Sequence, residues 1–294
     1  MKLGSNDISA VKIGSTDVNK IYIGSTEVWT SFTGLLDTYT GASAAYSLRR
    51  LSSTYEGSAI EVRRASDNAT QDIGFVNNEL DTSTLATFCS GTNGFVTTWY
   101  DQSGNGNDAT QTTAASQPKI YDSSSGVIEE NGKPTLKFDG TNDFLSNTLS
   151  SIISQPTYWF VTHNFHATPS AFDGVIGNLI TYPEHRLILS SSLNYGLQAG
   201  GSLQYNSYQA SQSLISYKIE QSDTRFYFNG LEQTISSGTG IGSEQLESIV
   251  LGAINQTIGY SPIQFQEIIL YPSDQSSNRS GIETNINDFY SIYP

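Results

Sequence analysis

The feature that most constrains this chain is a ten-residue unit that occurs three times near its start. The segments LGSNDISAVK, IGSTDVNKIY and IGSTEVWTSF follow one another without a gap over residues 3–32. An aliphatic residue, Gly-Ser, an acidic residue and Ile or Val recur in register, which predicts a repeating unit of strand, tight turn and strand. Three such units hold about thirty residues, too few for a core of their own. The repeat is therefore expected to gain stability from its neighbour or from copies of itself.

Behind the repeat, the apolar runs are short, alternate with polar residues and end at turn residues, which predicts a mainly β chain. We expect an arm over residues 1–33 for attachment and assembly, and one β domain over residues 34–294 that ends in a short helix. A first short helix is expected over 80–90, with Asp81 or Thr82 as its N-cap. The terminal helix is expected over 276–290, with Ile282, Ile286 and Phe289 on one face. The main predicted strands cover residues 46–51, 60–64, 95–100, 157–163, 248–253 and 263–272, with two more in 215–234.

Charge and composition exclude several classes of partner. The formal net charge is −14, with 14 Lys and Arg against 28 Asp and Glu, and such a surface repels a phosphate backbone, so nucleic acid is not an expected partner. No run approaches the roughly twenty apolar residues of a membrane span, and the first residues carry no apolar signal region. The single cysteine, Cys89, allows no internal disulfide and is expected in the core.

Four strings, taken in order, resemble the laminin-G-like, concanavalin A-like jelly-roll sandwich. They are WYDQSGNGNDAT (99–110), LKFDGTNDFL (136–145), RFYFNGLEQT (225–234) and FQEIILYP (265–272), followed by the terminal helix. The likeness covers about residues 46–290 and is similar in detail to the catalytic domain of fungal α-L-arabinofuranosidase B, which has almost the same YDQSGNGN loop. The resemblance implies two antiparallel sheets packed face to face.

The polar loop over residues 101–110 has two interpretations. Gly104 and Gly106 permit positive φ, and Asp101, Asn107 and Asp108 can bond to nearby backbone amides, which indicates a self-capping corner. The alternative is a calcium site with Asp101 and Asp108 as carboxylate ligands, because hard cations take six to eight oxygen ligands.

The resemblance also allows a test for catalysis. A retaining arabinofuranosidase needs two carboxyl groups, one as nucleophile and one as acid/base. In an ungapped alignment the nucleophile position falls on His185 and the acid/base position on Gln256, while Ser170-Ala171 replaces the family's adjacent cysteine pair. The chain is therefore predicted not to be an enzyme, unless a one-residue shift restores Glu184 and another acid, Asp173 or Glu267, takes the second role.

A jelly roll without catalytic carboxylates can still present aromatic side chains to sugars, which stack on their rings. The segment NYGLQAGGSLQYNSYQ (194–209) has the Gly, Ser, Asn and Tyr mixture of adaptable binding loops. The candidate ligand-binding residues are Tyr158, Trp159, Tyr182, His185, Tyr195, Tyr205 and Tyr208.

The repeat resembles those at the start of phage tail-fibre and other virion appendage proteins, in which the N-terminus joins the particle. We therefore expect a virion structural protein, either tail fibre or capsid decoration, made in the host cytoplasm. Its lectin-like domain would bind a cell-surface polysaccharide, and its arm would bind other virion proteins and form a homotrimer. The alternatives are a divergent glycoside hydrolase of arabinofuranosidase type and a purely structural knob. The arm residues expected to make the contacts are Ile13, Val18, Ile21, Ile23, Val28 and Trp29.

Overall fold

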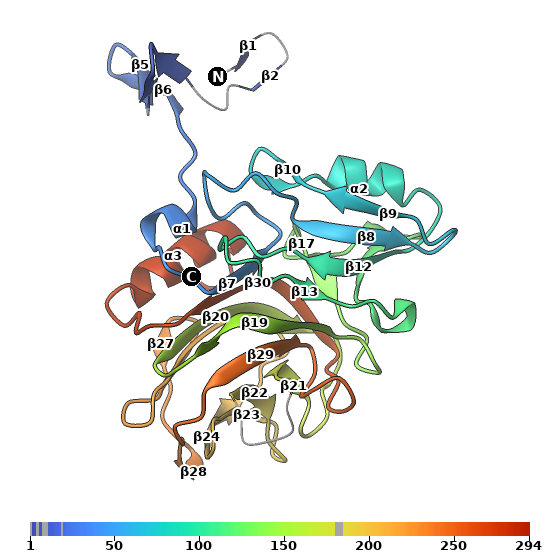
Figure 1. Ribbon diagram of the computed structural model, residues 1–294, viewed down its shortest axis with the longest axis vertical. Helices are drawn as coiled ribbons and strands as arrows, with labels where there is room; N and C mark the ends of the chain where they lie inside the picture. The colour runs from blue at the N-terminus through green and yellow to red at the C-terminus, as the bar shows by residue number, and fades with distance from the viewer. Residues whose placement is uncertain (1, 4–5, 8–10, 19, 180–184) are drawn as a thin grey trace.

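The body of the chain is a mainly β sandwich, as the alternating apolar pattern predicts (Figure 1). The computed structural model describes residues 2–3, 6–7, 11–18, 20–179 and 185–294. Two antiparallel sheets pack face to face, and a third group of strands lies between them and the N-terminal end (Figure 1). Hydrogen bonds through β12, β13 and β18 join these strands to both sheets.

The first sheet is built around two nine-residue strands, and every residue of β30 is buried, as are all but one of β20. Both strands are covered on both faces, which explains why residues 158–161 form a continuous apolar and aromatic run rather than an alternating pattern. The predicted central strand is confirmed and extends to Phe165. In spatial order the strands are β7 (Ala44–Ser47), β30 (Ile263–Tyr271), β20 (Thr157–Phe165), β25 (Ser213–Ile219), β26 (Arg225–Phe228) and β27 (Leu231–Glu232).

The second sheet packs against the inner face of the first. Its side chains and those of β20, β25 and β30 form the larger hydrophobic core, in which Trp159, Tyr217 and Ile249 are buried. In spatial order its strands are β19 (Leu145–Ile153), β29 (Leu246–Leu251), β21 (Gly174–Gly177), β22 (Arg186–Leu189), β23 (Asn194–Gln198), β24 (Ser202–Ser207) and β28 (Ser237–Gly240).

A third group of strands extends the body toward the N-terminal end. Its members are β8 (Ile60–Arg64), β9 (Thr70–Ile73), β12 (Gly94–Trp99), β13 (Ala109–Thr110), β14 (Lys119–Asp122), β15 (Gly126–Val127) and β18 (Leu136–Lys137), with the small pairs β10 (Phe75–Val76) and β11 (Glu79–Leu80), and β16 (Glu129–Glu130) and β17 (Lys133–Pro134). A 3₁₀ turn, η1 (Ala114–Ser116), precedes β14.

The two predicted helices are confirmed, with shorter bounds. In α2 (Thr82–Phe88) the Asp81 carboxylate accepts a hydrogen bond from the Thr84 amide, so Asp81 is the N-cap. Helix α3 (Arg279–Tyr290) buries Ile282 and Ile286 against the outer face of the first sheet, where a second core also includes residues of the short helix α1 (Leu35–Thr38). None of the described helices is long and apolar enough to cross a membrane.

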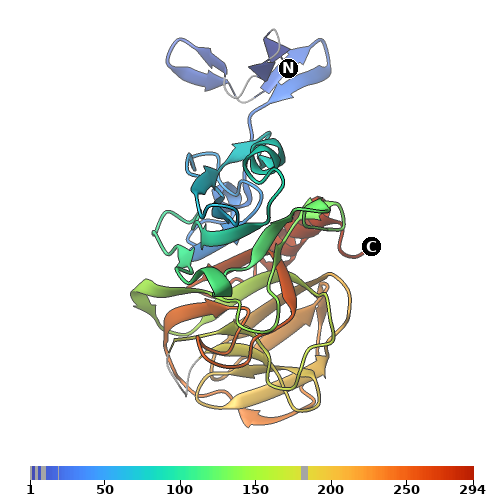
Figure 2. The same cartoon turned by 90° about the vertical axis from the view of Figure 1, so that its right-hand side faces the viewer.

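The described residues among the first thirty form three paired strand segments at one end of the long axis of the molecule (Figures 1 and 2). Gly14 and Gly24 have φ of +63° and +64° and open two-residue turns, a conformation that glycine adopts without steric cost. In the described part of the chain, each hairpin pairs only with itself. The hairpins are β1 (Lys2–Leu3) with β2 (Asn6–Asp7), β3 (Val11–Ile13) with β4 (Thr16–Val18), and β5 (Lys20–Ile23) with β6 (Thr26–Thr30).

A buried ion pair joins the first sheet to the end of α3. The carboxylate of Glu267, in β30, accepts hydrogen bonds from Arg49 Nε at 2.7 Å and Nη2 at 2.9 Å, and from Ser47 Oγ at 2.8 Å. Glu267 is 1% exposed and Arg49 is 8% exposed. The guanidinium also lies 4.8 Å from the Phe289 ring centroid. This bidentate ion pair compensates the negative charge of Glu267, which would otherwise be too costly to bury in the sheet.

Removing one partner of this pair should destabilise the fold strongly. We expect Arg49→Met to lower the free energy of unfolding by about 3–5 kcal/mol, because Glu267 would stay buried without its counter-charge. The double variant Arg49→Met with Glu267→Leu should recover most of that loss. Urea unfolding measures both.

The matched control is Arg225→Met, which removes the two exposed ion pairs of Arg225, with Asp223 and with Glu232. Exposed pairs contribute about 0–1 kcal/mol. A loss for Arg49→Met no larger than that of the control would show that the buried pair is not what holds α3 to the sheet.

Candidate functional site

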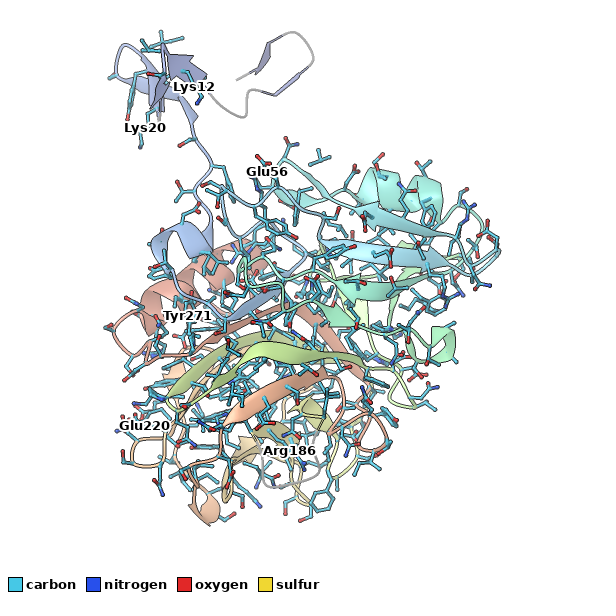
Figure 3. All side chains as sticks on the ribbon, in the orientation of Figure 1. Lys12, Lys20, Glu56, Arg186, Glu220 and Tyr271 are labelled. Carbon is cyan, nitrogen blue, oxygen red and sulfur yellow. The ribbon has the colours of Figure 1, made fainter. Side chains whose placement is uncertain are left out.

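Three segments distant in sequence meet at one edge of the second sheet. They are the loop before β21, the end of β22 at Leu189, and the loop that follows β29 over residues 252–262 (Figure 1). The Gly174 amide donates to the Gly259 carbonyl at 2.7 Å, and Ser261 Oγ donates to the Gly174 carbonyl at 2.9 Å. Arg186, labelled in Figure 3, begins β22 in the lower part of the body.

Glycine is required for this convergence at two positions. A Cβ built on Gly174 would lie 2.2 Å from the Ala253 carbonyl carbon, and one on Gly177 would lie 2.0 Å from the Ile254 carbonyl oxygen. Both contacts are with backbone atoms, which cannot move aside as a flexible side chain can. The absence of side chains at Gly174 and Gly177 therefore lets β21 approach the 252–262 loop closely.

Asp173 supplies a buried carboxyl group at this edge. Asp173 is only 6% exposed, and its Oδ2 accepts a hydrogen bond from the Ser170 amide at 2.7 Å. Burial raises the pKa of Asp173 above its usual value, and the hydrogen bond from Ser170 opposes that shift. The backbone of Asp173 is fixed in turn by Leu189 at the end of β22, whose amide donates to the Asp173 carbonyl at 2.9 Å.

The neighbouring residue, Phe172, is exposed and has a strained backbone. Its φ is +66°, in the left-handed region that bulky residues avoid, and the residue is 55% exposed. Such a conformation costs about 1–3 kcal/mol and tends to occur at functional sites. Ile258, on the facing loop, is 54% exposed. A carboxyl group with a raised pKa thus lies beside an exposed aromatic ring, an arrangement that can bind a sugar ring and transfer a proton to it.

The two positions aligned with catalytic carboxylates lie in different environments. His185 is 1% exposed, its Nε2 donates to the Glu244 carbonyl, and its Nδ1 faces Thr157 Oγ1 at 3.5 Å. Burial lowers the pKa of His185 to about 4, so the imidazole is neutral at pH 7. Gln256 is exposed and donates to Ser146 Oγ at 3.2 Å. Neither side chain can act as the nucleophile or acid of a glycosidase.

Two other acids were considered from the sequence, Glu267 and Glu184, and the structure describes only Glu267. Glu267 is held by Arg49 inside the body and cannot reach a ligand at this edge. Glu184 lies outside the described residues. Asp173 is therefore the carboxyl group that the described part of this edge offers for catalysis.

Most of the tyrosine and tryptophan residues expected to bind a ligand belong to the cores instead. Tyr158 and Trp159 are 0% and 1% exposed, and as neighbours in a strand they point to opposite faces of the first sheet. Tyr158 stacks on Phe160 in the core under α3, and Trp159 stacks on Tyr217 in the core between the sheets. The expectation that they form one sugar-binding face is corrected, because β20 has no exposed face.

The three other described tyrosine candidates are buried or half-buried. Tyr195 is fully buried and bonds to His163 Nε2 at 2.9 Å, and Tyr205, 1% exposed, stacks on Phe226 with centroids 4.7 Å apart. Tyr208 is half-buried and packs edge-on against Phe165. Tyr182 lies outside the described residues. Most of the 194–209 segment forms an antiparallel strand pair, β23 and β24, rather than the open binding loop expected of its composition.

The 101–110 loop has the geometry of a self-capping corner. Asp101 is 5% exposed, and its carboxylate accepts hydrogen bonds from the amides of Ala45, Ser103 and Asn107 at 2.8–3.0 Å. The Ser103 hydroxyl adds a fourth donor at 2.7 Å. Asp108 accepts from the Asp101 amide at 2.8 Å. In the part of the chain that the structure describes, no three His, Cys, Asp or Glu residues gather as metal ligands. The oxygens that calcium would need on Asp101 are already bound by donors, so these two residues do not fit the ion.

This loop predicts a stability effect that does not depend on a metal. We expect Asp101→Asn to lower the free energy of unfolding by about 1–3 kcal/mol, because the amide nitrogen of Asn cannot accept the hydrogen bonds that one carboxylate oxygen receives. Thermal unfolding with and without a chelator measures the effect. Asp288→Asn, on the exposed side of α3, is the control. A fall in the melting temperature of the unaltered protein on chelation would favour the calcium interpretation instead.

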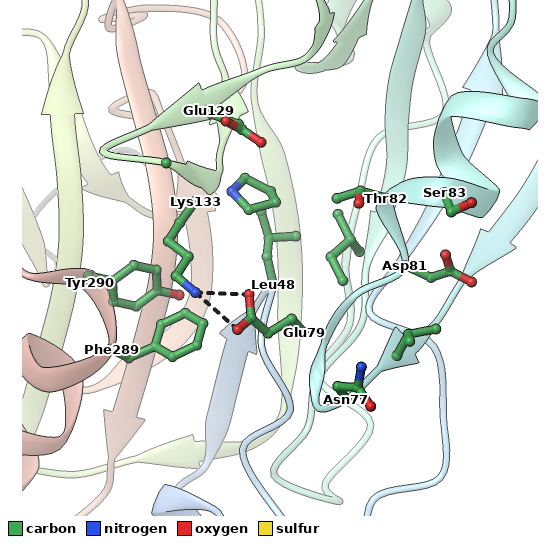
Figure 4. Close-up of a pocket in the computed structure, with 14 residues that line it drawn as sticks. Leu48, Asn77, Glu79, Asp81, Thr82, Ser83, Glu129, Lys133, Phe289 and Tyr290 are labelled. Atoms are coloured by element: carbon green, nitrogen blue, oxygen red, sulfur yellow. Dashed lines mark hydrogen bonds and ion pairs between the residues drawn. The ribbon is translucent and has the colours of Figure 1, made fainter. Parts of the chain in front are cut away.

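A hollow of about 380 Å³ lies elsewhere, between α2 and the end of α3 (Figure 4). Lys133 crosses it, with Nζ 3.0 and 2.9 Å from the two oxygens of Glu79 and 4.1 Å from the Phe289 ring centroid. Lys133 and Glu79 are thus already paired with each other. None of the residues aligned with catalytic positions lines this hollow.

Sequence reasoning named Asp173 only as an alternative acid and missed Phe172. The string AFDGV gave one usable signal, an aromatic residue and an acid directly before a glycine at a strand start. The left-handed backbone of Phe172 depends on contacts with Gly259 and Leu189, which no local pattern indicates.

Comparison with known proteins finds a family likeness in the first part of the body. Residues 36–135 match the family model for the catalytic domain of α-L-arabinofuranosidase B. Over 96 residues the chain is 40% identical to α-L-arabinofuranosidase B of Emericella nidulans, which is 30% of this chain and 19% of that protein. The chain thus spans about a fifth of the length of this curated relative.

Solved structures share the fold over most of the chain. A GH54 α-L-arabinofuranosidase soaked with a cyclic sulfate inhibitor aligns with a TM-score of 0.62 at 19% identity, over 86% of this chain and 65% of that one. An arabinofuranosidase complexed with arabinofuranosyl-α-1,2-xylobiose gives 0.59 at 20% identity, over 86% and 64%. A mutant GH54 enzyme soaked with 4-nitrophenyl α-L-arabinofuranoside gives 0.64 at 18% identity, over 86% and 65%.

These matches correct the functional expectation drawn from the repeat. The predicted phage virion appendage, its location in a virion and its non-enzymatic role are wrong, because the family model and the curated relative are both α-L-arabinofuranosidase B. The likeness to virion repeats covered only about thirty residues, whereas the family match covers residues 36–135 of the body. The prediction that the chain is not an enzyme rested on an ungapped alignment, which placed the nucleophile position at His185, a buried residue.

Proposed function

We propose that this chain is a glycoside hydrolase of the arabinofuranosidase type, which cleaves α-L-arabinofuranosides. The observation that carries the proposal is the buried carboxyl group of Asp173 beside the exposed Phe172, at an edge of a sandwich that resembles arabinofuranosidases. The family match over residues 36–135 supports the substrate class. It does not include the edge, so the assignment of site residues comes from the geometry.

Asp173 has the properties of a general acid. A carboxyl group must be protonated to donate to a leaving-group oxygen, and burial raises the pKa of Asp173 so that this form persists to higher pH. The Ser170 amide fixes Oδ2, which leaves the other oxygen to approach the glycosidic bond. Phe172 offers the apolar surface against which a sugar ring can rest.

Glycoside hydrolysis requires a second carboxyl group, whose distance from the first decides between retention and inversion. By sequence we assign this role to Glu184, which lies two residues before the first residue of β22. His185 and Gln256 cannot replace it, since one is a neutral buried imidazole and the other an amide.

Release of 4-nitrophenol from 4-nitrophenyl α-L-arabinofuranoside tests the activity. We expect turnover by the unaltered protein, and a fall in kcat of about 100-fold or more for Asp173→Asn. The fall should be larger for an arabinofuranosyl oligosaccharide, whose leaving group needs protonation more than nitrophenolate does. Glu184→Gln should also remove turnover, while Asp288→Asn, the matched control on α3, should not change it.

The pH dependence follows from the same shift. Activity that needs protonated Asp173 should fall as pH rises through its pKa, which burial places above the ordinary value. As the pH rises through this pKa, the buried carboxyl group ionises and the folded state loses stability relative to the unfolded state. Asp173→Asn cannot ionise, so it should be at least as stable as the unaltered protein at pH 7. An inactive variant of undiminished melting temperature would thus separate catalysis from folding. Full activity in Asp173→Asn would overturn the assignment.

For the architecture, we propose the concanavalin A-like jelly-roll topology for residues 34–294, with residues 1–33 as an assembly arm. The arm proposal is supported by exposure, since Ile13 and Ile23, the first residues of two repeats, are 77% and 72% exposed. Val18 and Ile21 are half-buried, and the side chains of Val28 and Trp29 lie outside the described part. A two-stranded hairpin alone is marginally stable in water. Association of arms from three copies would cover these apolar residues.

Deleting residues 1–32 should convert a trimer into a monomer while leaving the melting temperature of the body and the turnover of a small aryl substrate unchanged. Light scattering gives the mass of each form. The double variant Ile13→Ser with Ile23→Ser is the milder test and should weaken association in the same direction. A full-length chain that is monomeric at high concentration would exclude the arm as an assembly device.

A further inference from the structure

A second hollow, of about 630 Å³, lies on the third group of strands and is separate from the site at Asp173. We define the β14 groove by six of the residues that line it: Phe95, Lys119, Val127, Lys137, Asp139 and Asp143. They come from β12, β14, β15, β18 and the loop over residues 139–144. No step of the proposed hydrolysis uses these residues.

The floor of the groove is a row of side chains on neighbouring strands. Phe95 pairs with Lys119 in register, and Lys119 pairs with Lys137, so all three project from the same face. Two lysines directly opposite each other in a sheet repel, which destabilises the pair unless other groups compensate. Lys119 reaches Asp122 at 3.1 Å. Lys137 has no hydrogen-bond or ion-pair partner in the part of the chain that the structure describes.

The wall of the groove contains a buried carboxyl group with an open oxygen. Asp143 is 6% exposed, and its Oδ2 accepts from the Asp139 amide at 2.9 Å. No described residue donates to its Oδ1. Asp139 uses one oxygen to accept the amides of Thr141 and Asn142 at 2.7 and 3.2 Å. Burial, with the nearby charge of Asp139, raises the pKa of Asp143 to about 7. Because Oδ1 has no described donor and is not among the solvent-inaccessible atoms, it can accept a hydrogen bond from a hydroxyl group bound in the groove.

The mixture of groups points to a neutral polyhydroxylated ligand. Two lysines face four carboxyl groups, those of Asp122, Glu129, Asp139 and Asp143, so an anion would be repelled overall. The lysines in turn disfavour a metal cation. A sugar hydroxyl can donate to Asp143 and accept from Lys137 at once. Apolar surface for a ring comes from Val127 and from the part of Phe95 that is not covered by Arg63 and Lys119, whose charged groups lie 5.1 and 5.8 Å from its ring centroid.

The groove is joined to the candidate catalytic edge. Phe144, directly after Asp143, lies with its ring centroid 6.4 Å from that of Tyr260 in the 252–262 loop. A Cβ on Gly140 would lie 2.9 Å from the Pro262 nitrogen, so the two loops are in close contact. His166 Nε2 donates to the Phe138 carbonyl at 2.8 Å, which ties the loop before β21 to the same wall. One carbohydrate chain could therefore contact both places.

We propose that the β14 groove is a non-catalytic binding site for the neutral backbone of a polysaccharide, held by Asp143, Lys137 and Phe95. The choice of a pentose backbone rests on the proposed arabinofuranosidase function, whereas the site itself rests on the geometry of the groove. Binding there would keep a branched substrate on the protein while arabinofuranosyl groups are removed at Asp173.

Xylotetraose is a suitable probe because it contains no arabinofuranosyl bond and is not consumed by the proposed activity. We expect calorimetry and amide chemical shifts of the full chain to show binding, with the shifts concentrated in residues 119–143. Asp143→Asn and Lys137→Gln should each weaken binding by roughly tenfold or more. Asp288→Asn should bind as the unaltered protein does. Asp143→Asn should keep or raise the melting temperature at pH 8, because it removes a buried acid whose pKa is raised.

Three results would overturn the proposal: no binding of xylotetraose at about 10 mM, shifts that map away from the residues lining the groove, Phe95 included, or unaltered affinity in both groove variants. The assay with 4-nitrophenyl α-L-arabinofuranoside separates this outcome from the proposed function, since that small substrate does not reach the groove. A protein that cleaves the aryl substrate but does not bind xylotetraose would support the hydrolase function and overturn the groove proposal. A protein that binds xylotetraose but shows no turnover would lack only the hydrolase activity.

Discussion

The pairing of β20 with β30, buried on both faces, is the constraint on which the rest of the structure depends. One face contributes Trp159, Val161 and Ile268 to the core between the sheets, and the other contributes Tyr158 and Ile269 to the core under α3. Because neither face can reach water, a charged side chain on these strands needs an internal partner. Arg49 is the partner of Glu267, whose full charge would be the most costly group on these strands to bury alone.

Local patterns in the sequence were sufficient for the elements whose signals are local. Asp81 caps α2, Ile282 and Ile286 face the sheet, and Gly14 and Gly24 open turns, each for a reason readable within a few residues. Burial on both faces was harder to use. The same residues that identified β20 as central, Tyr158 and Trp159, were also expected to bind a ligand, and a strand covered on both sides cannot do both.

The candidate site was less accessible from the sequence because it is assembled by tertiary contacts. Asp173 is brought to the edge by backbone bonds to Leu189, and its loop meets Gly259, which lies 86 residues further along the chain. An ungapped alignment has no access to such contacts, and it selected His185, whose ring points into the body. The thirty-residue repeat was easy to recognise but says little about chemistry that resides in the body.

The left-handed backbone of Phe172 has a consequence for how this edge can evolve. Replacing Phe172 by glycine would release conformational strain and make the folded chain more stable, yet it would remove the exposed ring next to Asp173. Selection for stability and selection for ligand contact therefore act in opposite directions on a single side chain. A lineage that no longer needed the site would be free to lose this aromatic residue, and its persistence or loss among close variants would record whether the edge is in use.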